Sequence, residues 1–182
     1  MLFRSQVGGG GWAYNAPDSR RLRGPLDAEA LRCALESVAA THEILRTTYT
    51  TLDGEPIQRI HPPSRFALET IDLSGRPEPE RTEKLHALLE AYSEVPFDLE
   101  RDPPFRARLF RLGPQDHVLV TVVHHIAIDG SSRHTFWSDI ASAYGQALRG
   151  ATPVLAEPPL QRSEEHTSEL QSPCNLVCRL LL

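Results

Sequence analysis

A run of apolar, mostly β-branched residues, Val118–Val123, ends abruptly in two polar side chains, His124 and His125. Asp129 and Gly130 follow closely. The run predicts a buried strand, and glycine argues against a helix continuing through the segment behind it. Successive side chains of a strand point to opposite faces, so we expect the two imidazoles to point apart and not to share one small ligand.

Amphipathic periodicity predicts three helices, over residues 27–41, 79–94 and 131–149. Asp27 is expected to cap the first helix, because its carboxylate can accept from free amides of the first turn. Ser131 or Ser132 is expected to cap the last helix, and Gly150 to end it.

Shorter segments predict strands over residues 49–51, 56–60 and 66–72, besides the run that ends at His124. The dipeptide Asp53-Gly54 is typical of the tight turn of a β-hairpin between the first and second of these. Helices therefore alternate with strands along the chain, which indicates a mixed α/β fold.

Composition narrows the choice of function classes. The chain has 182 residues, 40% hydrophobic content and a formal net charge of −5, which gives no support for nucleic-acid binding. We expect a cytoplasmic protein without a membrane partner, because no apolar run approaches a membrane span and no signal-peptide core follows the first residues. Cys33, Cys174 and Cys178 form no disulfide framework and are weak evidence for a metal site.

The C-terminal segment departs from the character of the preceding sequence. Back-translated, Arg162–Ser172 resembles a widely used short-read sequencing adapter. We therefore expect residues 1–161 to form the protein domain and residues 162–182 to be a non-native tail, in preference to a genuine polar linker with a short apolar strand.

The histidine pair allows three interpretations from its residues alone. It can be a buried, hydrogen-bonded pair at a strand end. It can be a metal site, although third and fourth ligands at suggestive spacing are missing nearby. It can contain an acid–base histidine, the residue whose unperturbed pKa suits proton transfer near neutrality.

The pattern His-His-x-x-x-Asp-Gly at a strand end is similar to the core motif of condensation domains of nonribosomal peptide synthetases. The surrounding chain extends the resemblance from about Trp12 to Gln161. Its parts are an aromatic-Asn-x-Pro segment, the family's second motif (with Thr41 where an arginine usually stands), and a loop and strand that lead to the core motif: Trp12–Pro17, His42–Tyr49, Pro96–Leu99 and Pro103–Leu109. The resemblance therefore implies a strand over residues 103–109, and another over residues 20–24, after the first of these segments.

The resemblance implies a mixed sheet packed with helices, in a lobe like chloramphenicol acetyltransferase. Condensation domains have two such lobes, and this chain resembles the N-terminal lobe only. We therefore expect an incomplete domain that lacks its C-terminal lobe and is inactive by itself, because one wall of the cleft is absent.

The resemblance also implies the activity. The family joins two carrier-bound acyl or aminoacyl thioesters through an amide bond in secondary metabolite biosynthesis. The implied partners are peptidyl or acyl carrier domains, which supply the phosphopantetheine, and an adenylation domain of the same synthetase. No directly bound cofactor and no metal is implied. The alternatives are an epimerisation domain, a coenzyme A-dependent acyltransferase of the same fold, or a non-catalytic lobe that docks carriers.

On this resemblance His125 is the catalytic residue, as base or as the group that positions the amine. His124 is expected to be structural, in line with the strand alternation.

Asp129 is expected to fix the loop by pairing with an arginine. Arg46 is the first candidate for that partner and Arg106 the second. Gly130 is expected to supply backbone freedom, with its amide hydrogen close to the site.

Overall fold

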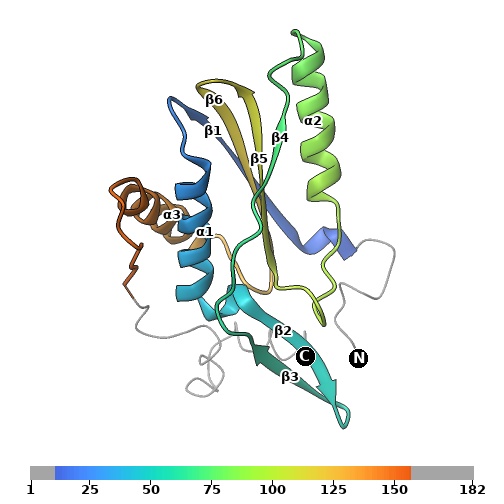
Figure 1. Cartoon of the computed structure of the whole chain (residues 1–182). Helices are drawn as coiled ribbons and strands as arrows, with labels where there is room; N and C mark the ends of the chain where they lie inside the picture. The colour runs from blue at the N-terminus through green and yellow to red at the C-terminus, as the bar shows by residue number, and fades with distance from the viewer. Residues whose placement is uncertain (1–10, 157–182) are drawn as a thin grey trace.

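A computed structural model describes residues 11–156 of the chain. Figure 1 shows these residues as one sheet flanked by helices, with a β-hairpin projecting beside it. In chain order the elements are a short 3₁₀ turn (Gly11–Tyr14), β1 (Asn15–Arg23), α1 (Ala28–Thr41), a second 3₁₀ turn (Glu43–Arg46), β2 (Thr47–Leu52), β3 (Glu55–Ile60), β4 (Glu69–Asp72), α2 (Glu80–Ser93), β5 (Phe105–Gly113), β6 (Asp116–His124) and α3 (Ser132–Leu148).

Strand β6 lies inside the sheet, whose order is β1-β6-β5-β4. It pairs antiparallel with β1 along its whole length, from Asn15 opposite His124 to Arg23 opposite Asp116. On its other side it pairs antiparallel with β5, and β4 adds to β5 in parallel. The strand that ends at the histidine pair is therefore buried between two neighbours, as its apolar sequence predicts.

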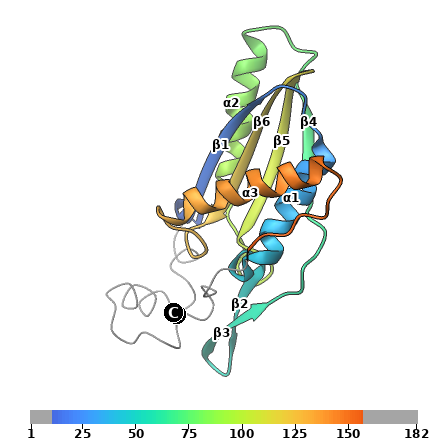
Figure 2. The ribbon, with the colours of Figure 1, turned by 90° about the vertical axis from the view of Figure 1, so that its left-hand side faces the viewer.

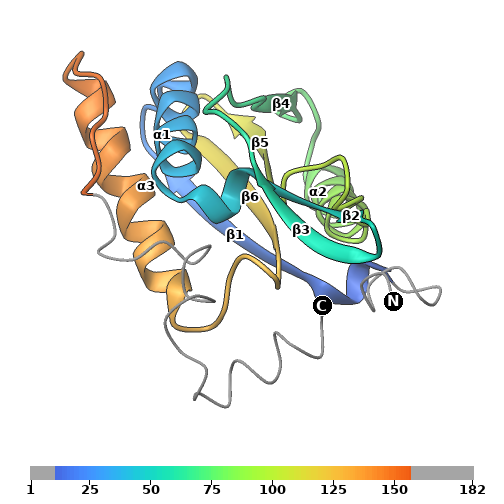
Figure 3. The same cartoon turned by 90° about the horizontal axis from the view of Figure 1, so that it is seen from below.

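The sheet has a helix pair on one face and a single helix on the other. Figures 2 and 3 show α1 and α3 side by side on one face, with α2 on the opposite face. Alternation along β6 divides the core accordingly. Leu119 and Val123 pack with α1 and α3, whereas Val120 and Val122 pack with the cluster that includes Leu85 of α2.

Three short-range predictions are confirmed: a helix cap, a hairpin turn and a glycine after the last helix. Asp27 caps α1, since its Oδ1 accepts from the backbone amides of Glu29 and Ala30 at 2.9 Å each. The hairpin turn has left-handed backbone at Asp53 (φ 52°) and Gly54 (φ 86°), which is the conformation that Asp-Gly favours. Gly150 (φ 74°) follows the end of α3 as predicted.

Several strand boundaries differ from the prediction, among them those of β2 and β5, and the starts of β1 and β4 show why. Strand β1 begins at Asn15 and not at residue 20, because all of it is paired with β6. Strand β4 begins at Glu69 and not at residue 66. Phe66 precedes that strand and packs its ring on Phe105, with ring centroids 4.9 Å apart. In both cases a long-range contact overrides the local pattern.

Candidate active site

The end of β6 is held by both of its neighbours. The backbone amide of His124 donates to the carbonyl of Pro104 at 2.9 Å, and that of His125 donates to the carbonyl of Tyr14 at 2.8 Å. The chain then turns, and the amide of Ala127 donates to the carbonyl of His124 at 2.9 Å. The backbone of the histidine pair is therefore anchored to the start of β5 on one side and to the start of β1 on the other.

The two imidazoles lie in different environments. His124 is 5% exposed, whereas His125 is exposed to solvent. This agrees with the predicted alternation of side chains along a strand. The predicted catalytic role of His125 and the predicted structural role of His124 are not tested by this arrangement and stay predictions.

One hydrogen bond favours a single tautomer of the His124 ring, and burial favours its neutral state. Its Nδ1 accepts from the backbone amide of Ile126 at 3.1 Å, so the ring proton resides on Nε2. The ring stacks on Tyr14 at a centroid distance of 6.0 Å and meets Phe97 edge to face at 6.1 Å. Burial, assisted by the nearby His125, lowers the pKa of His124 from 6.5 to about 4.

Asp129 forms the N-terminal cap of α3. Its Oδ1 accepts from the backbone amide of Ser132 at 2.9 Å and from the hydroxyls of Ser131 and Ser132 at 2.7 Å each. The prediction that one of the serines caps this helix is therefore wrong, since Ser131 makes no side-chain capping bond. The carboxylate outcompetes the hydroxyls because it offers a charged acceptor at the positive end of the helix dipole.

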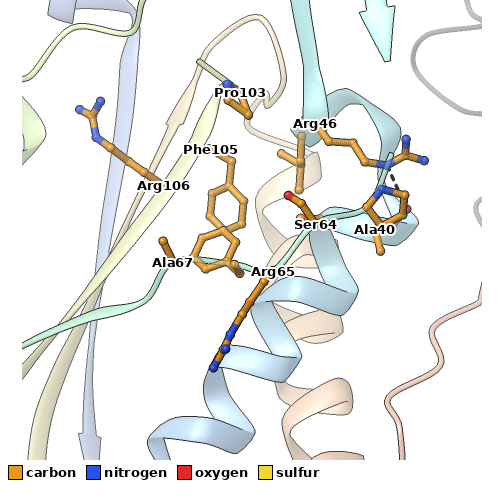
Figure 4. Close-up of a pocket in the computed structure, with 12 residues that line it drawn as sticks. Ala40, Arg46, Ser64, Arg65, Ala67, Pro103, Phe105 and Arg106 are labelled. Atoms are coloured by element: carbon orange, nitrogen blue, oxygen red, sulfur yellow. Dashed lines mark hydrogen bonds between the residues drawn. The ribbon is translucent and has the colours of Figure 1, made fainter. Parts of the chain in front are cut away.

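The two arginines predicted to pair with Asp129 have other partners. Arg46 donates to the carbonyls of Ala40, at 3.3 Å, and of His61, and pairs with Glu43 at 3.4 Å. Figure 4 shows its guanidinium directed toward Ala40.

Arg106 donates to the carbonyl of Tyr92 at 3.1 Å and to that of Val95. The predicted pairing of Asp129 with Arg46 or Arg106 is thus corrected. Each arginine reaches the end of the helix that covers its own face of the sheet, and Asp129 lies at the start of a third helix.

Gly130 has no local conformational need for glycine. Its φ lies outside the left-handed region, and a Cβ at this position would meet no atom within 4 Å. The prediction that Gly130 supplies backbone freedom is therefore not supported by the turn itself.

A pocket of about 210 Å³ opens between the end of α1, the segment before β4 and the start of β5 (Figure 4). Phe105 points toward this pocket, and the side chain of Arg106 points away from it, to the other face of the sheet. Most of the residues that line it are apolar, and the polar ones are Arg46, Ser64, Arg65 and Arg106. The pocket therefore belongs to the α1 face, and the ring of His124 belongs to the α2 face.

Sequence reasoning assigned no role to several residues that surround the histidine pair. Tyr14 and Asn15 lie in the aromatic-Asn-x-Pro segment, and Phe97 lies in the loop before β5. Their spacing in the sequence carries no sign of contact with His124, because they approach it only through β1 pairing and through the path of the chain after α2.

The sequence also gave expectations about metal binding, membrane spans and cysteines, and the structure bears on them only within residues 11–156. Among residues 11–156 no group of three or more His, Cys, Asp or Glu side chains could hold a metal ion. None of the helices in the same range is long and apolar enough to cross a membrane. Cys33 is a free, half-buried thiol. Cys174, Cys178 and the predicted tail, residues 162–182, lie outside the described residues.

The comparisons with known proteins agree on one family. A family model described as "Condensation domain" matches residues 1–173. The match continues past the predicted boundary at Gln161 and does not test it, so that boundary stays a prediction.

Curated relatives match over most of this chain. Chondramide synthase cmdD of Chondromyces crocatus is 39% identical over 90% of this chain and 4% of its own length. Cyclosporin synthetase simA of Tolypocladium inflatum is 38% identical over 88% of this chain and 1% of its own length. The chain thus spans a few per cent or less of the length of these relatives.

Solved structures agree with the fold. The X-domain from teicoplanin biosynthesis aligns with a TM-score of 0.76 and 34% identity, over 98% of this chain and 41% of that one. The first condensation domain of the CDA synthetase aligns with a TM-score of 0.73 and 26% identity, over 86% and 41% of the two chains. The predicted mixed sheet packed with helices, like chloramphenicol acetyltransferase, is confirmed.

Proposed function

Because the chain belongs to the condensation-domain family, we propose that it forms the histidine-bearing lobe of a domain that joins two carrier-bound acyl groups through an amide bond. The observation that carries the proposal is the division of the histidine pair. His124 is buried and neutral within the fold, and His125 is exposed on a backbone anchored to β1. Of the three interpretations of the pair, this arrangement favours an acid–base histidine supported by a structural one.

In the proposed reaction the amine of the acceptor attacks the thioester carbonyl of the donor. The new C–N bond forms, the C–S bond breaks, and the carrier thiol leaves with a proton. His125 accepts the proton that the amine loses and returns it to the thiolate, or holds the amine in line for attack. A positioned acid–base group typically contributes about 10²–10⁴-fold to such a rate.

The state of His124 favours this role for its neighbour. At neutral pH the ring of His124 is uncharged, since burial is the main cause that holds its pKa at about 4. A proton taken up by His125 therefore meets no like charge on the adjacent residue. The Nδ1 of His124 holds the amide of Ile126, so the turn that presents His125 is fixed on both sides of that residue.

The remaining contributions come from outside this lobe. Alignment of two tethered substrates can lower the barrier by up to about 7–11 kcal/mol in well-oriented cases. We propose that a C-terminal lobe supplies the second wall of the cleft, that carrier domains supply the phosphopantetheine thioesters, and that an adenylation domain in the same synthetase loads them. The lobe alone is then inactive.

The test is amide formation between two loaded carrier proteins, catalysed by the intact domain that contains this sequence. His125→Ala is expected to reduce turnover by about 10²–10⁴-fold. His134→Ala is the matched control, because His134 is an exposed histidine on α3. Unchanged turnover in the His125 variant would overturn the assignment, and turnover by this chain alone would show that one lobe suffices.

A further inference from the structure

We propose that Asn15 and Arg106 act as positioning residues for the histidine pair, by clamping the chain that leaves α2 so that Phe97 supports the ring of His124. This inference rests on the function proposed for His125. It concerns residues on three different elements, β1, α2 and β5, that meet at the end of β6.

Asn15 connects the start of β1 with the end of α2. Its Nδ2 donates to the carbonyl of Ser93 at 2.7 Å and to that of Val95 at 2.8 Å. The last carbonyls of a helix have no partner within the helix, and both amide hydrogens of asparagine are used to satisfy the carbonyls at this end. Asn15 lies opposite His124 in the β1–β6 register and directly follows Tyr14, whose carbonyl accepts from His125.

Arg106 reaches the same helix end from β5. Its Nη2 donates to the carbonyls of Tyr92 and Val95, so the carbonyl of Val95 accepts from both arms of the clamp. The guanidinium also lies over the ring of Phe97, with its central carbon 4.2 Å from the ring centroid. A cation is favourable at the negative end of the α2 dipole and on the face of an aromatic ring.

The partners of Arg106 offset part of the cost of burying its charge. Burial lowers the pKa of Arg106, and within residues 11–156 its guanidinium contacts carbonyls and aromatic rings rather than a carboxylate. Its Nε has no hydrogen-bond partner among these residues, so the two carbonyls and Phe97 supply the favourable contacts, and losing them is costly.

The clamp is coupled to the histidines through Phe97. That ring contacts both the guanidinium of Arg106 and the imidazole of His124, which it meets edge to face at 6.1 Å. The imidazole in turn accepts from the amide of Ile126 in the turn after His125. The sequence of contacts from the clamp to the turn is therefore Arg106, Phe97, His124 and Ile126.

Arg108 provides a matched control on the same strand and the same face. Its guanidinium lies 4.3 Å from the ring centroid of Tyr92 and pairs with Glu69. In the described part of the chain its cation–π and ion-pair contacts involve neither Phe97 nor the carbonyl of Val95. Removing this cation changes the packing of Tyr92, which Arg106 also contacts, but takes away none of the contacts with Phe97 and the carbonyl of Val95.

The experiment compares Arg106→Gln with Arg108→Gln in the intact domain. Imidazole nitrogen NMR is expected to show His124 as the Nε2–H tautomer in the wild type and in Arg108→Gln. In Arg106→Gln it should show a mixture of tautomers, and kcat for amide formation should fall by about 10–100-fold with little change in KM, as for a displaced catalytic group. Arg106→Lys should also give a mixture of tautomers and a lowered kcat. An ammonium has no planar face to stack on Phe97 and no forked donors for two carbonyls.

Phe97→Leu serves if Arg106→Gln does not fold, because it keeps an apolar side chain in the core and the carbonyl bonds of Arg106 while it removes the aromatic ring between Arg106 and His124. It should reproduce the tautomer mixture. A single Nε2–H tautomer together with wild-type kcat in the Arg106 or Phe97 variant would overturn the inference. The NMR measurement is independent of the chemistry, so failure of the role proposed for His125 would leave this inference separately testable.

Discussion

Arg46 and Arg106 each bind the end of a helix, on opposite faces of the sheet, but their other partners differ. Arg46 donates to Ala40 at the end of α1, and Arg106 donates to Tyr92 at the end of α2. Both use the favourable interaction of a cation with the last carbonyls of a helix. Arg46 has an acidic partner, Glu43, and lies by the pocket. Arg106 lies on an aromatic ring that contacts His124.

The two faces differ around these arginines. The face under α1 and α3 is packed largely with apolar side chains, among them Phe105 and Phe136, whose rings meet edge to face at 5.4 Å. The face under α2 is apolar along most of the strands and ends in His124. The comparison shows that the imidazole of His124 is accommodated beside the end of α2 by two aromatic rings and one backbone amide, while its Nε2 has no hydrogen-bond partner among the described residues.

The largest loss of stability is expected from a substitution on the face of the sheet under α1 and α3. Phe105→Ala should lower the free energy of unfolding by about 3–5 kcal/mol, because the ring is 6% exposed and packs on both Phe66 and Phe136. Denaturant unfolding of the intact domain measures the loss, with Leu52→Ala, at a 60% exposed position, as the control. At a temperature where the variant is folded, the tautomer of His124 should be unchanged. An altered tautomer would mean that the faces are not separate in function.

The second prediction is that the free energy of unfolding depends on pH because of His124 on the α2 face. In the unfolded chain His124 titrates near 6.5, and in the folded protein its pKa is about 4. Between these values the unfolded state binds more protons, so the free energy of unfolding falls as the pH is lowered through this range and is unaffected above it. The lowered pKa of His124 corresponds to a loss of unfolding free energy of roughly 3 kcal/mol at the low end of this range.

Unfolding measured from pH 8 to about pH 4 tests this dependence. The slope should persist in His134→Gln and become shallower in His124→Asn, which removes the buried imidazole. Carboxylates with a lowered pKa, such as Asp116 beside Arg21, add a slope near pH 4 in both variants. The same slope in both variants would assign the dependence to other groups.

The smallest effect concerns the third helix end. Asp129→Ala should lower the free energy of unfolding by about 1 kcal/mol, because the first turn of α3 loses its cap. Asp129→Asn should cost less, since an amide oxygen can still accept from Ser132. Thermal unfolding of both variants measures the difference. An equal loss in both would show that the negative charge, rather than the cap, stabilises this turn.

Short-range patterns in the sequence determined much of the scaffold. The apolar run before His124 predicted a central strand and the opposite environments of the two histidines, because side-chain direction in a strand depends only on position. The cap at Asp27 and the Asp53-Gly54 turn were also predicted correctly. A cap and a tight turn are formed by residues within a few positions of one another.

Only the tertiary structure decided which partners the polar groups take. Arg46, or else Arg106, was predicted to pair with Asp129, but an arginine side chain binds whichever acceptors the fold brings within reach, here the ends of α1 and α2. The support of His124 by Phe97 likewise depends on where the chain runs after α2. These contacts join residues far apart in the sequence. Their geometry follows from how the helices cover the two faces of the sheet, which no local pattern encodes.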